Sequence, residues 1–172
     1  MMRVFLAGLT LVFIHSLAFA YSGKVIAVQE GDRLTILHNG KKLNVQLYGI
    51  DAPELQQAFG SDARSFLDAF TKEETVEVEP IGTVKKGRLT GMVMLGSDNI
   101  NELLLLKGQA WVDRAQCTAD ICTKWIKMEE AAKATKKGLW SDPQAMPPWE
   151  FRAQNAPKPA TKPAGKKSAK QQ

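Results

Sequence analysis

Histidine and cysteine are scarce in this chain. Its 172 residues include two histidines, His15 and His38, and two cysteines, Cys117 and Cys122. His15 lies in the first twenty residues, which are expected to be removed, so His38 is the one histidine of the expected mature chain. This excludes paired-histidine ribonuclease chemistry and histidine-based metal centres. The chain also lacks a glycine-rich phosphate loop, a G-x-S-x-G nucleophile elbow and an internal repeat. Catalytic chemistry, if present, is therefore expected from carboxylates and arginines.

Long apolar runs are absent after the first twenty residues. Met1-Met2-Arg3 is a short basic start, residues 4–17 are almost wholly apolar, and Ala18-Phe19-Ala20 fits an A-x-A cleavage site. The apolar run is short for a membrane anchor, and the cleavage site favours a signal peptide over that alternative. We therefore expect a cleaved signal peptide over 1–20, no membrane span after cleavage, and an exported mature chain, periplasmic or secreted, that starts near Tyr21.

Excess basic charge is confined to the ends of the chain. The net charge is +5, from 23 Lys and Arg against 18 Asp and Glu. Without Arg3 and the five lysines after Arg152, 17 basic residues face 18 acidic ones, so residues 21–152 carry a net charge of −1. Binding to nucleic acid therefore needs a local patch. Lys85 and Lys86, beside Arg88, are candidates for phosphate contacts, and a solvated basic loop is the alternative.

The two cysteines are separated by only four residues. In an exported protein, such a pair is expected to form a disulfide that closes a small loop. A zinc site is the alternative, but it needs four ligands, and His38 is the one histidine of the expected mature chain. We predict a Cys117–Cys122 disulfide with a modest and mostly local stabilising effect.

The segment from Gly23 to Tyr48 has the alternation and turn signals of three strands. The expected strands are 24–28, 34–37 and 43–47, with an acidic turn after the first and an Asn39-Gly40 hairpin after the second. Alternation along the third strand predicts two faces. The core-facing side chains are Leu43, Val45 and Leu47, and the opposite ones are Asn44, Gln46 and Tyr48. Gln46 is therefore expected on the same face as the approach to Asp51.

Later segments predict two more strands and three helices. Residues 75–79 and 89–95 are strand-like; residues 60–70, 101–107 and 124–137 read as helices, with Ser61 as a candidate N-cap. Five strands with turns, and then helices, indicate an α+β barrel. We expect one domain over 21–152. Residues 153–172 are rich in Lys, Pro and Ala without an apolar period, which predicts a disordered tail.

The densest group of charged residues follows the third strand. Gly49-Ile50-Asp51-Ala52-Pro53-Glu54 places two carboxylates three residues apart in a turn that Pro53 restricts. Such carboxylates are able to converge on one point, one holding a hard cation and the other handling a water. This arrangement suits hydrolysis of a phosphodiester. Glu30-Gly31-Asp32-Arg33 lies upstream, and Lys86-Gly87-Arg88 lies downstream.

Together these segments resemble the staphylococcal nuclease (thermonuclease-like) family. That family has an acidic D-G-D-T-type turn, a strand that ends R-L-x-G-I-D-A-P-E, and a later Y-G-R. The likeness runs from about Gly23 to Arg152 and includes residues 108–112, 138–140 and 147–150. It implies a five-stranded OB-fold barrel with about three helices. It also implies a Ca²⁺-dependent endonuclease that hydrolyses DNA and RNA and leaves a 3′-phosphate. We expect a monomer.

The resemblance implies a role for each matching residue. Asp32 and Asp51 are the candidate Ca²⁺ ligands, and the carbonyl of Ala52 is able to complete the shell. Glu54 is the candidate general base, and Arg88 is the candidate phosphate clamp. Taken singly, the same residues have simpler explanations, as turn-capping aspartates, a surface glutamate and a solvated arginine.

Two departures from the family pattern bear on activity. Gln46 stands where the family has arginine, and Arg33 stands where it usually has threonine. Losing one charged donor in such a site costs about 3 kcal/mol of transition-state stabilisation, so a weakened nuclease is expected. Arg33 is a candidate substitute, although alternation predicts that it faces away from Asp32.

Two other hypotheses remain open. One is a catalytically silent OB-fold module that binds nucleic acid or a protein, which Gln46 favours. In the other, the lysine-rich tail is the main functional element and tethers the domain to an anionic surface.

Overall fold

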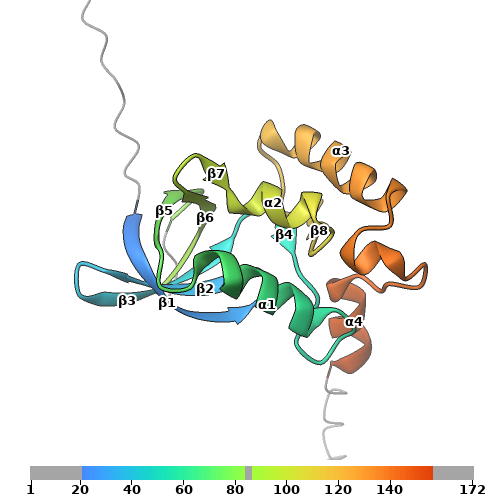
Figure 1. Ribbon diagram of the computed structural model, residues 1–172, viewed down its shortest axis with the longest axis horizontal. Helices are drawn as coiled ribbons and strands as arrows, with labels where there is room; N and C mark the ends of the chain where they lie inside the picture. The colour runs from blue at the N-terminus through green and yellow to red at the C-terminus, as the bar shows by residue number, and fades with distance from the viewer. Residues whose placement is uncertain (1–20, 84–86, 157–172) are drawn as a thin grey trace, which may run out of the picture.

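A closed five-stranded barrel forms the body of the protein. The computed structural model describes residues 21–83 and 87–156 (Figure 1). The barrel strands are β1 (Tyr21–Glu30), β2 (Arg33–His38), β3 (Lys41–Leu47), β5 (Thr75–Pro80) and β6 (Arg88–Leu95). Antiparallel pairs join β1 to β2 and β5, β2 to β3, and β5 to β6, and the parallel pair β3–β6 closes the barrel. The predicted α+β fold with an OB-type barrel is confirmed.

Three very short strands lie outside the barrel. β4 (Ile50–Asp51) pairs with β8 (Trp111–Val112), and β7 (Asp98–Asn99) pairs with the end of β6. Each of these strands is two residues long, which is too short to show an alternation of apolar and polar side chains, so the sequence does not predict them. The β4–β8 pair matters for function because it contains Asp51.

Inward-facing side chains of the five strands fill the barrel. The fully buried ones are Val25, Leu34, Ile36, Val45, Val76, Val78, Leu89 and Val93. On β3, Val45 and Leu47 are buried as predicted, and Leu43 is half-buried. Tyr48 was expected on the opposite face but is only 6% exposed. The alternation fails there because the chain leaves the strand and turns at Tyr48 and Gly49.

Helices pack on the outside of the barrel. They are α1 (Gly60–Thr71), α2 (Ile100–Leu106), α3 (Ile121–Ala134) and α4 (Pro148–Asn155), with a 3₁₀ helix at Gly138–Ser141. Figure 1 shows α2 and α3 side by side, with α4 below them on the same side of the barrel. About three helices were predicted, and the additional one is α4. Its eight residues are too short for a clear helical period, although Pro148 at its start is a favourable helix-initiating residue.

Helix boundaries differ from the predicted ones for local reasons. Ser61 is not an N-cap, because α1 already begins at Gly60, after Phe59 with a φ of 65°. α3 spans 121–134 instead of 124–137, and Lys136 with a φ of 51° lies just beyond its end. α4 extends to Asn155, three residues past the expected domain boundary at Arg152.

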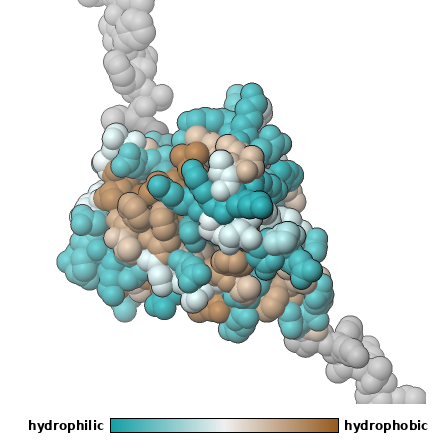
Figure 2. Space-filling model, turned by 45° about the vertical axis from the view of Figure 1, so that its right-hand side comes forward, coloured by the Kyte–Doolittle hydropathy of each residue, from teal (hydrophilic) through white to brown (hydrophobic). Residues whose placement is uncertain are grey.

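The described surface includes exposed hydrophobic side chains. Figure 2 shows one face on which hydrophobic residues gather in patches among hydrophilic ones. The large hydrophobic side chains that are exposed are Leu37, Leu55, Phe70, Leu106 and Trp149. Within residues 21–83 and 87–156, no helix combines the length and the apolar character needed to cross a bilayer.

Candidate active site

The acidic turn between β1 and β2 brings Asp32 into the interior. A Cβ atom on Gly31 would lie 2.6 Å from Cβ of Ala63 in α1 and 2.8 Å from Cβ of Ala52, so the close approach requires glycine. Asp32 is 5% exposed, and its Oδ2 accepts a hydrogen bond from the Ala52 N–H at 3.1 Å. Its backbone carbonyl accepts a hydrogen bond from the Leu47 N–H at 2.9 Å. The turn is thus attached both to the end of β3 and to the residue that follows β4.

Asp51 is positioned by the β4–β8 pair, in which it lies opposite Trp111. Gly49, just before β4, has a φ of 68°, a conformation that favours glycine. A Cβ atom at this position would also lie 2.7 Å from Sγ of Cys117. Substitution of Gly49 would therefore disturb the turn that presents Asp51.

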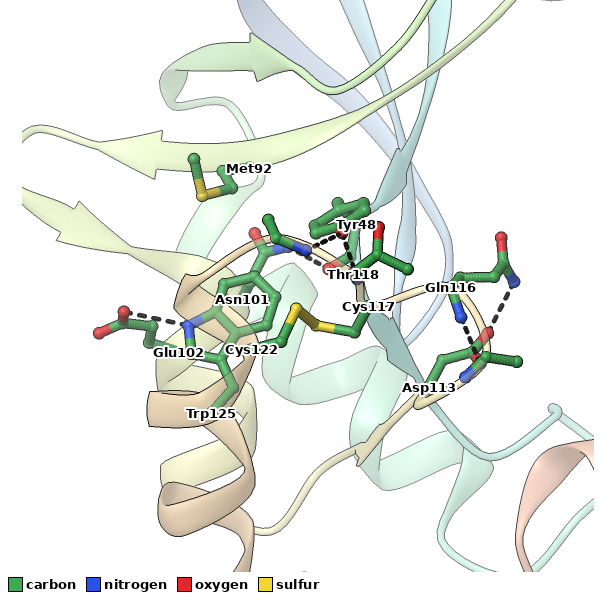
Figure 3. The surroundings of a disulfide bond; sticks show 12 residues. Tyr48, Met92, Asn101, Glu102, Asp113, Gln116, Cys117, Thr118, Cys122 and Trp125 are labelled. Atoms are coloured by element: carbon green, nitrogen blue, oxygen red, sulfur yellow. Dashed lines mark hydrogen bonds between the residues drawn. A yellow bond between two sulfur atoms is a disulfide. The ribbon is translucent and has the colours of Figure 1, made fainter.

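The Cys117–Cys122 disulfide lies next to this turn and confirms the predicted pairing. Figure 3 shows its surroundings, which include Tyr48 and Trp125. The Tyr48 hydroxyl accepts hydrogen bonds from the N–H groups of Thr118 at 2.8 Å and Ala119 at 3.1 Å. Burial by itself would raise the pKa of Tyr48, but these hydrogen bonds outweigh it and lower the pKa. The disulfide loop is therefore linked to the residues that lead into β4.

Strand pairing places Arg33, Gln46 and Arg88 on one face of the barrel. Arg33 on β2 lies opposite Gln46 on β3, and Arg88 on β6 lies opposite Asn44 on β3. Asn44 is two residues before Gln46 and therefore points to the same face of the strand. The prediction that Arg33 faces away from Asp32 is wrong: both residues line the same cleft. Asp32 belongs to the turn, so the alternation of β2 does not extend to it. Gln46 faces the cleft as expected, and its Nε2 donates to the Asp32 carbonyl at 3.2 Å.

Glu54 follows Asp51 in a turn that its neighbours support. Its backbone N–H donates to the Gln57 side-chain oxygen at 3.2 Å, and the Gln57 N–H donates back to the Glu54 carbonyl at 2.8 Å. The Gln57 amide also donates to the Met146 carbonyl, just before α4. Gln57 therefore connects the turn of the candidate base to the start of the last helix.

Arg152 of α4 and Asp113 are charged cleft residues that the sequence analysis missed, and Arg152 contacts two of the predicted residues. Its Nη1 donates to Asp51 Oδ1 at 3.0 Å and to Glu54 Oε1 at 2.7 Å, and its Nη2 donates to Asp51 Oδ2 at 2.7 Å. The hydrogen bond to Asp51 raises the pKa of Arg152 against the opposing effect of burial, so the guanidinium stays charged. The Pro147-Pro148 helix start was the available signal, but it gives no sign of a contact across 101 residues of sequence.

These side chains line one cleft of about 290 Å³. It contains all six of the predicted residues that the structure describes: Asp32, Gln46, Asp51, Ala52, Glu54 and Arg88. Its other charged lining residues are Glu30, Arg33, Asp113 and Arg152. Among the residues that the structure describes, five carboxylates thus share the cleft with three guanidinium groups. Lys85 and Lys86, the other candidates for phosphate contact, lie outside the described residues.

The electrostatics around Asp32 suit a bound cation. Burial raises its pKa to about 7; the Ala52 N–H opposes this shift, and the charge of Asp51 adds to it. Within the described ranges, no three His, Cys, Asp or Glu side chains gather as a ready-made metal cage. The donors are instead the carboxylates of Asp32 and Asp51 and the carbonyl of Ala52, all hard oxygens of the kind that Ca²⁺ prefers, with water able to fill other positions. These residues fit a hard divalent cation.

A second hollow, of about 500 Å³, adjoins the cleft, and Asp51 and Arg152 line both. Trp149 and Val112 add apolar surface to it, and Trp149 is 38% exposed. An exposed indole beside charged side chains is a suitable surface for stacking a nucleobase.

Comparison with known proteins identifies the family. Residues 44–142 match the family described as Staphylococcal nuclease homologue. The chain is 31% identical over 159 residues to protein ParB of Escherichia coli, across 87% of this chain and 89% of that protein. It is 33% identical over 141 residues to the micrococcal nuclease of Shigella flexneri, across 77% and 80% of the two chains. It is 30% identical over 131 residues to an uncharacterized endonuclease of Escherichia coli O157:H7, across 76% and 84%. The chain belongs to the staphylococcal nuclease family.

Proposed function

We propose that the protein is an exported, Ca²⁺-dependent endonuclease that hydrolyses DNA and RNA. The observation that carries this proposal is the convergence of Asp32, Asp51, Glu54 and Arg88 on one cleft. Relatives named micrococcal nuclease and endonuclease match more than three quarters of the chain, which supports the same reaction class.

In this proposal, two carboxylates hold the cation. Asp32, Asp51 and the carbonyl of Ala52 would hold Ca²⁺, which would supply positive charge to offset that of the phosphate. Asp32 is held by the Ala52 N–H, and Asp51 by its strand pairing, so the two ligands come from a firmly positioned backbone.

Glu54 and Arg88 carry out the other functions. Glu54 orients the attacking water and takes its proton, while the water oxygen forms a bond to phosphorus. The P–O5′ bond breaks, and the leaving 5′-oxygen takes a proton from solvent water, so the products are a 3′-phosphate and a 5′-hydroxyl. Arg88 donates hydrogen bonds to the phosphate oxygens as negative charge develops on them. The hollow beside Trp149 gives room for an adjoining base, which favours a nucleic acid as the substrate.

Export is proposed from two observations. The N-terminal sequence combines a basic start, an apolar run and the A-x-A site, and the Cys117–Cys122 disulfide suits an oxidising compartment. Intact-mass measurement of the protein recovered from the periplasm or medium is expected to give a chain that begins at Tyr21 and is two protons lighter than its reduced form.

The alternative function is a silent module that binds nucleic acid without cleaving it. The uncharged Gln46 in the cleft, and the engagement of both Asp51 and Glu54 by Arg152, favour this alternative.

Digestion of single-stranded DNA and of RNA by purified mature protein tests the proposal. We expect cleavage with Ca²⁺, loss of cleavage after addition of a chelator, and recovery after excess Ca²⁺. New 5′-hydroxyl ends should accept phosphate from a polynucleotide kinase without prior dephosphorylation. Cleavage that continues in chelator would contradict the metal role of Asp32 and Asp51. Binding without any cleavage would favour the silent module.

A further inference from the structure

We propose that Arg152 is a second phosphate-binding guanidinium, which pairs with Asp51 and Glu54 until cation and substrate bind. The inference rests on the proposed function, because it adds a residue of α4 to the same reaction. Two consequences follow: Arg152 opposes binding of the cation, and it favours binding of the phosphate.

The position of Arg152 is the first argument. Its guanidinium bridges the candidate cation ligand and the candidate base, at 2.7–3.0 Å from three of their oxygens. A phosphate attacked by a water at Glu54, next to a cation at Asp51, would lie between the same two carboxylates. Arg152 is thus already located where a donor to that phosphate is needed.

The anchoring of α4 is the second argument. The Gln57 amide bonds to the Met146 carbonyl, and Pro148 at the helix start is buried, so the backbone that carries Arg152 is fixed near the cleft. The Arg152 side chain itself is 49% exposed, whereas those of Asp51 and Glu54 are only 10% and 19% exposed. The long side chain is therefore the partner with room to move when the ion pairs break.

The charge balance of the cleft is the third argument. A phosphodiester is an anion, and five carboxylates of the described residues line the cleft that it would enter. Arg33 already forms an ion pair with Glu30 at 2.6 Å, and Gln46 carries no charge. Arg152 adds a guanidinium to that of Arg88, and it does so from a different element of the fold.

The hydrogen bonds of Asp51 connect the two effects. Both of its carboxylate oxygens accept from Arg152, and a cation at Asp51 needs lone pairs of those same oxygens. A cation at Asp51 would compete with the guanidinium for these oxygens, and the N–H groups that it freed would be able to donate to the phosphate. A residue that only anchored α4 would not have opposite effects on the two ligands.

Two substitutions at Arg152 and one matched control test the inference. Arg152→Gln removes the charge, and Arg152→Lys keeps the charge without the paired donors. Lys124→Gln is the control, because it also removes one positive charge and one exposed ion pair, here with Glu102 on the helices outside the cleft. Thermal unfolding of all three variants establishes that they are folded.

The main measurement is binding without turnover. Calorimetry with Ca²⁺ alone is expected to show about tenfold tighter binding for Arg152→Gln, because a positive charge next to the ligand has been removed. Binding of a phosphorothioate single-stranded DNA, in saturating Ca²⁺, is expected to weaken by about tenfold in the same variant. Lys124→Gln should change neither affinity, and Arg152→Lys should fall between the wild type and Arg152→Gln in both.

Cleavage and its rescue provide the second measurement. Loss of one charged donor is expected to lower the rate of Arg152→Gln by about a hundredfold. Adding Gln46→Arg to this variant places a guanidinium on the same cleft face as Arg88 and should raise its cleavage rate at least tenfold, by a larger factor than the same substitution gives in the wild type. A larger gain in the Arg152→Gln background supports a role of Arg152 at the phosphate, whereas an equal gain in both backgrounds would contradict it.

Several outcomes would overturn the inference. Unchanged Ca²⁺ and DNA affinities in Arg152→Gln would show that Arg152 has no role in binding the cation or the phosphate. A fall in both affinities together with the melting temperature would show that Arg152 only anchors the helix. A wild-type protein that does not cleave would overturn the proposed function instead, and opposite shifts in Ca²⁺ and DNA affinity would still decide the role of Arg152.

Discussion

At the scale of single residues, the cleft is organised by carboxylates whose surroundings differ. Asp32 is buried and accepts a hydrogen bond from a backbone N–H, whereas Asp51 and Glu54 both accept hydrogen bonds from Arg152. These surroundings suit different tasks. The buried charge of Asp32 requires a counter-ion, whereas Asp51 and Glu54 are expected to become available to other partners when Arg152 moves away from them. Two predictions follow from these environments.

Glu54→Gln is expected to remove nearly all nuclease activity without unfolding the protein. The substitution keeps the size of the side chain and an oxygen that is able to accept from Arg152, but it removes the base that takes the proton from water. We expect a loss of at least a hundredfold in kcat with a melting temperature close to that of wild type. Turnover at the wild-type rate would remove Glu54 from the mechanism.

Asp32→Asn is expected to stabilise the cation-free protein at alkaline pH. The pKa of Asp32 in the folded protein is about 7, above the ordinary value of 3.8, so between these values the folded chain holds a proton that the unfolded chain has lost. The stability that this group contributes is therefore lost as the pH rises through about 7. With chelator at pH 8, the variant should be more stable by something on the order of 2 kcal/mol, and near pH 4 the two proteins should be alike.

Urea unfolding at the two pH values measures this difference, and saturating Ca²⁺ at pH 8 should restore the stability of the wild type alone. Parallel pH profiles of stability for wild type and Asp32→Asn would contradict the burial argument.

At the scale of elements, the barrel supplies Asp32, Gln46 and Arg88, while segments outside it complete the site. The disulfide loop packs behind Gly49, and β8 pairs with Asp51. A buried carboxylate on α3, Glu129, also accepts a hydrogen bond from the Val112 N–H at 3.1 Å and so fixes β8. Positioning of Asp51 thus depends on α3 and on the loop before it.

The double substitution Cys117→Ser and Cys122→Ser is expected to lower both stability and activity. Closing a loop of this size stabilises the fold by about 2 kcal/mol in the chain-entropy account. Activity should fall as well, because the loop supports the turn before Asp51. Urea unfolding and kcat measure the two effects, and treatment of the wild type with a reductant should reproduce both. An unchanged unfolding free energy would show that the bridge is not a stabilising element.

At the scale of the whole molecule, charge is separated between the folded body and the C-terminal segment. Residues 21–152 carry a net charge of −1, and the basic residues after Arg152 are Lys158, Lys162, Lys166, Lys167 and Lys170. Attraction to a polyanion at a distance is therefore expected from this segment rather than from the barrel. The cleft would then act on substrate that the segment has helped to bring near.

A variant truncated after Ala156 tests whether the C-terminal lysines attract nucleic acid while the cleft cleaves it. We expect weaker binding to single-stranded DNA at low salt, and a slope of log K against log salt that is smaller by about 0.7 for each lysine that contacts a phosphate. The value of kcat at saturating DNA should stay at the wild-type level. Anisotropy titrations across a salt series give the slope. An unchanged slope would rule out the tethering role of the lysines.

Much of the fold and part of the candidate site were predictable because they depend on local patterns. The alternation of Val45 and Leu47 and the turn signals at Asn39-Gly40 and Gly31 gave the strands of the barrel. The segment Gly49–Glu54 identified Asp51 and Glu54 as candidates. The short pairs β4 and β8 were not predictable, because two residues carry no periodicity.

The sequence by itself determined the family, the barrel, the disulfide partners and the residues that the motifs supply, since each depends on residue type and short spacing. Only the tertiary structure decided that Tyr48 is buried, that Arg33 shares the cleft with Asp32, and that Arg152 pairs with Asp51 and Glu54. The physical reason is that the direction of a side chain beyond a turn, and contact between residues about a hundred positions apart, depend on how the elements pack in space.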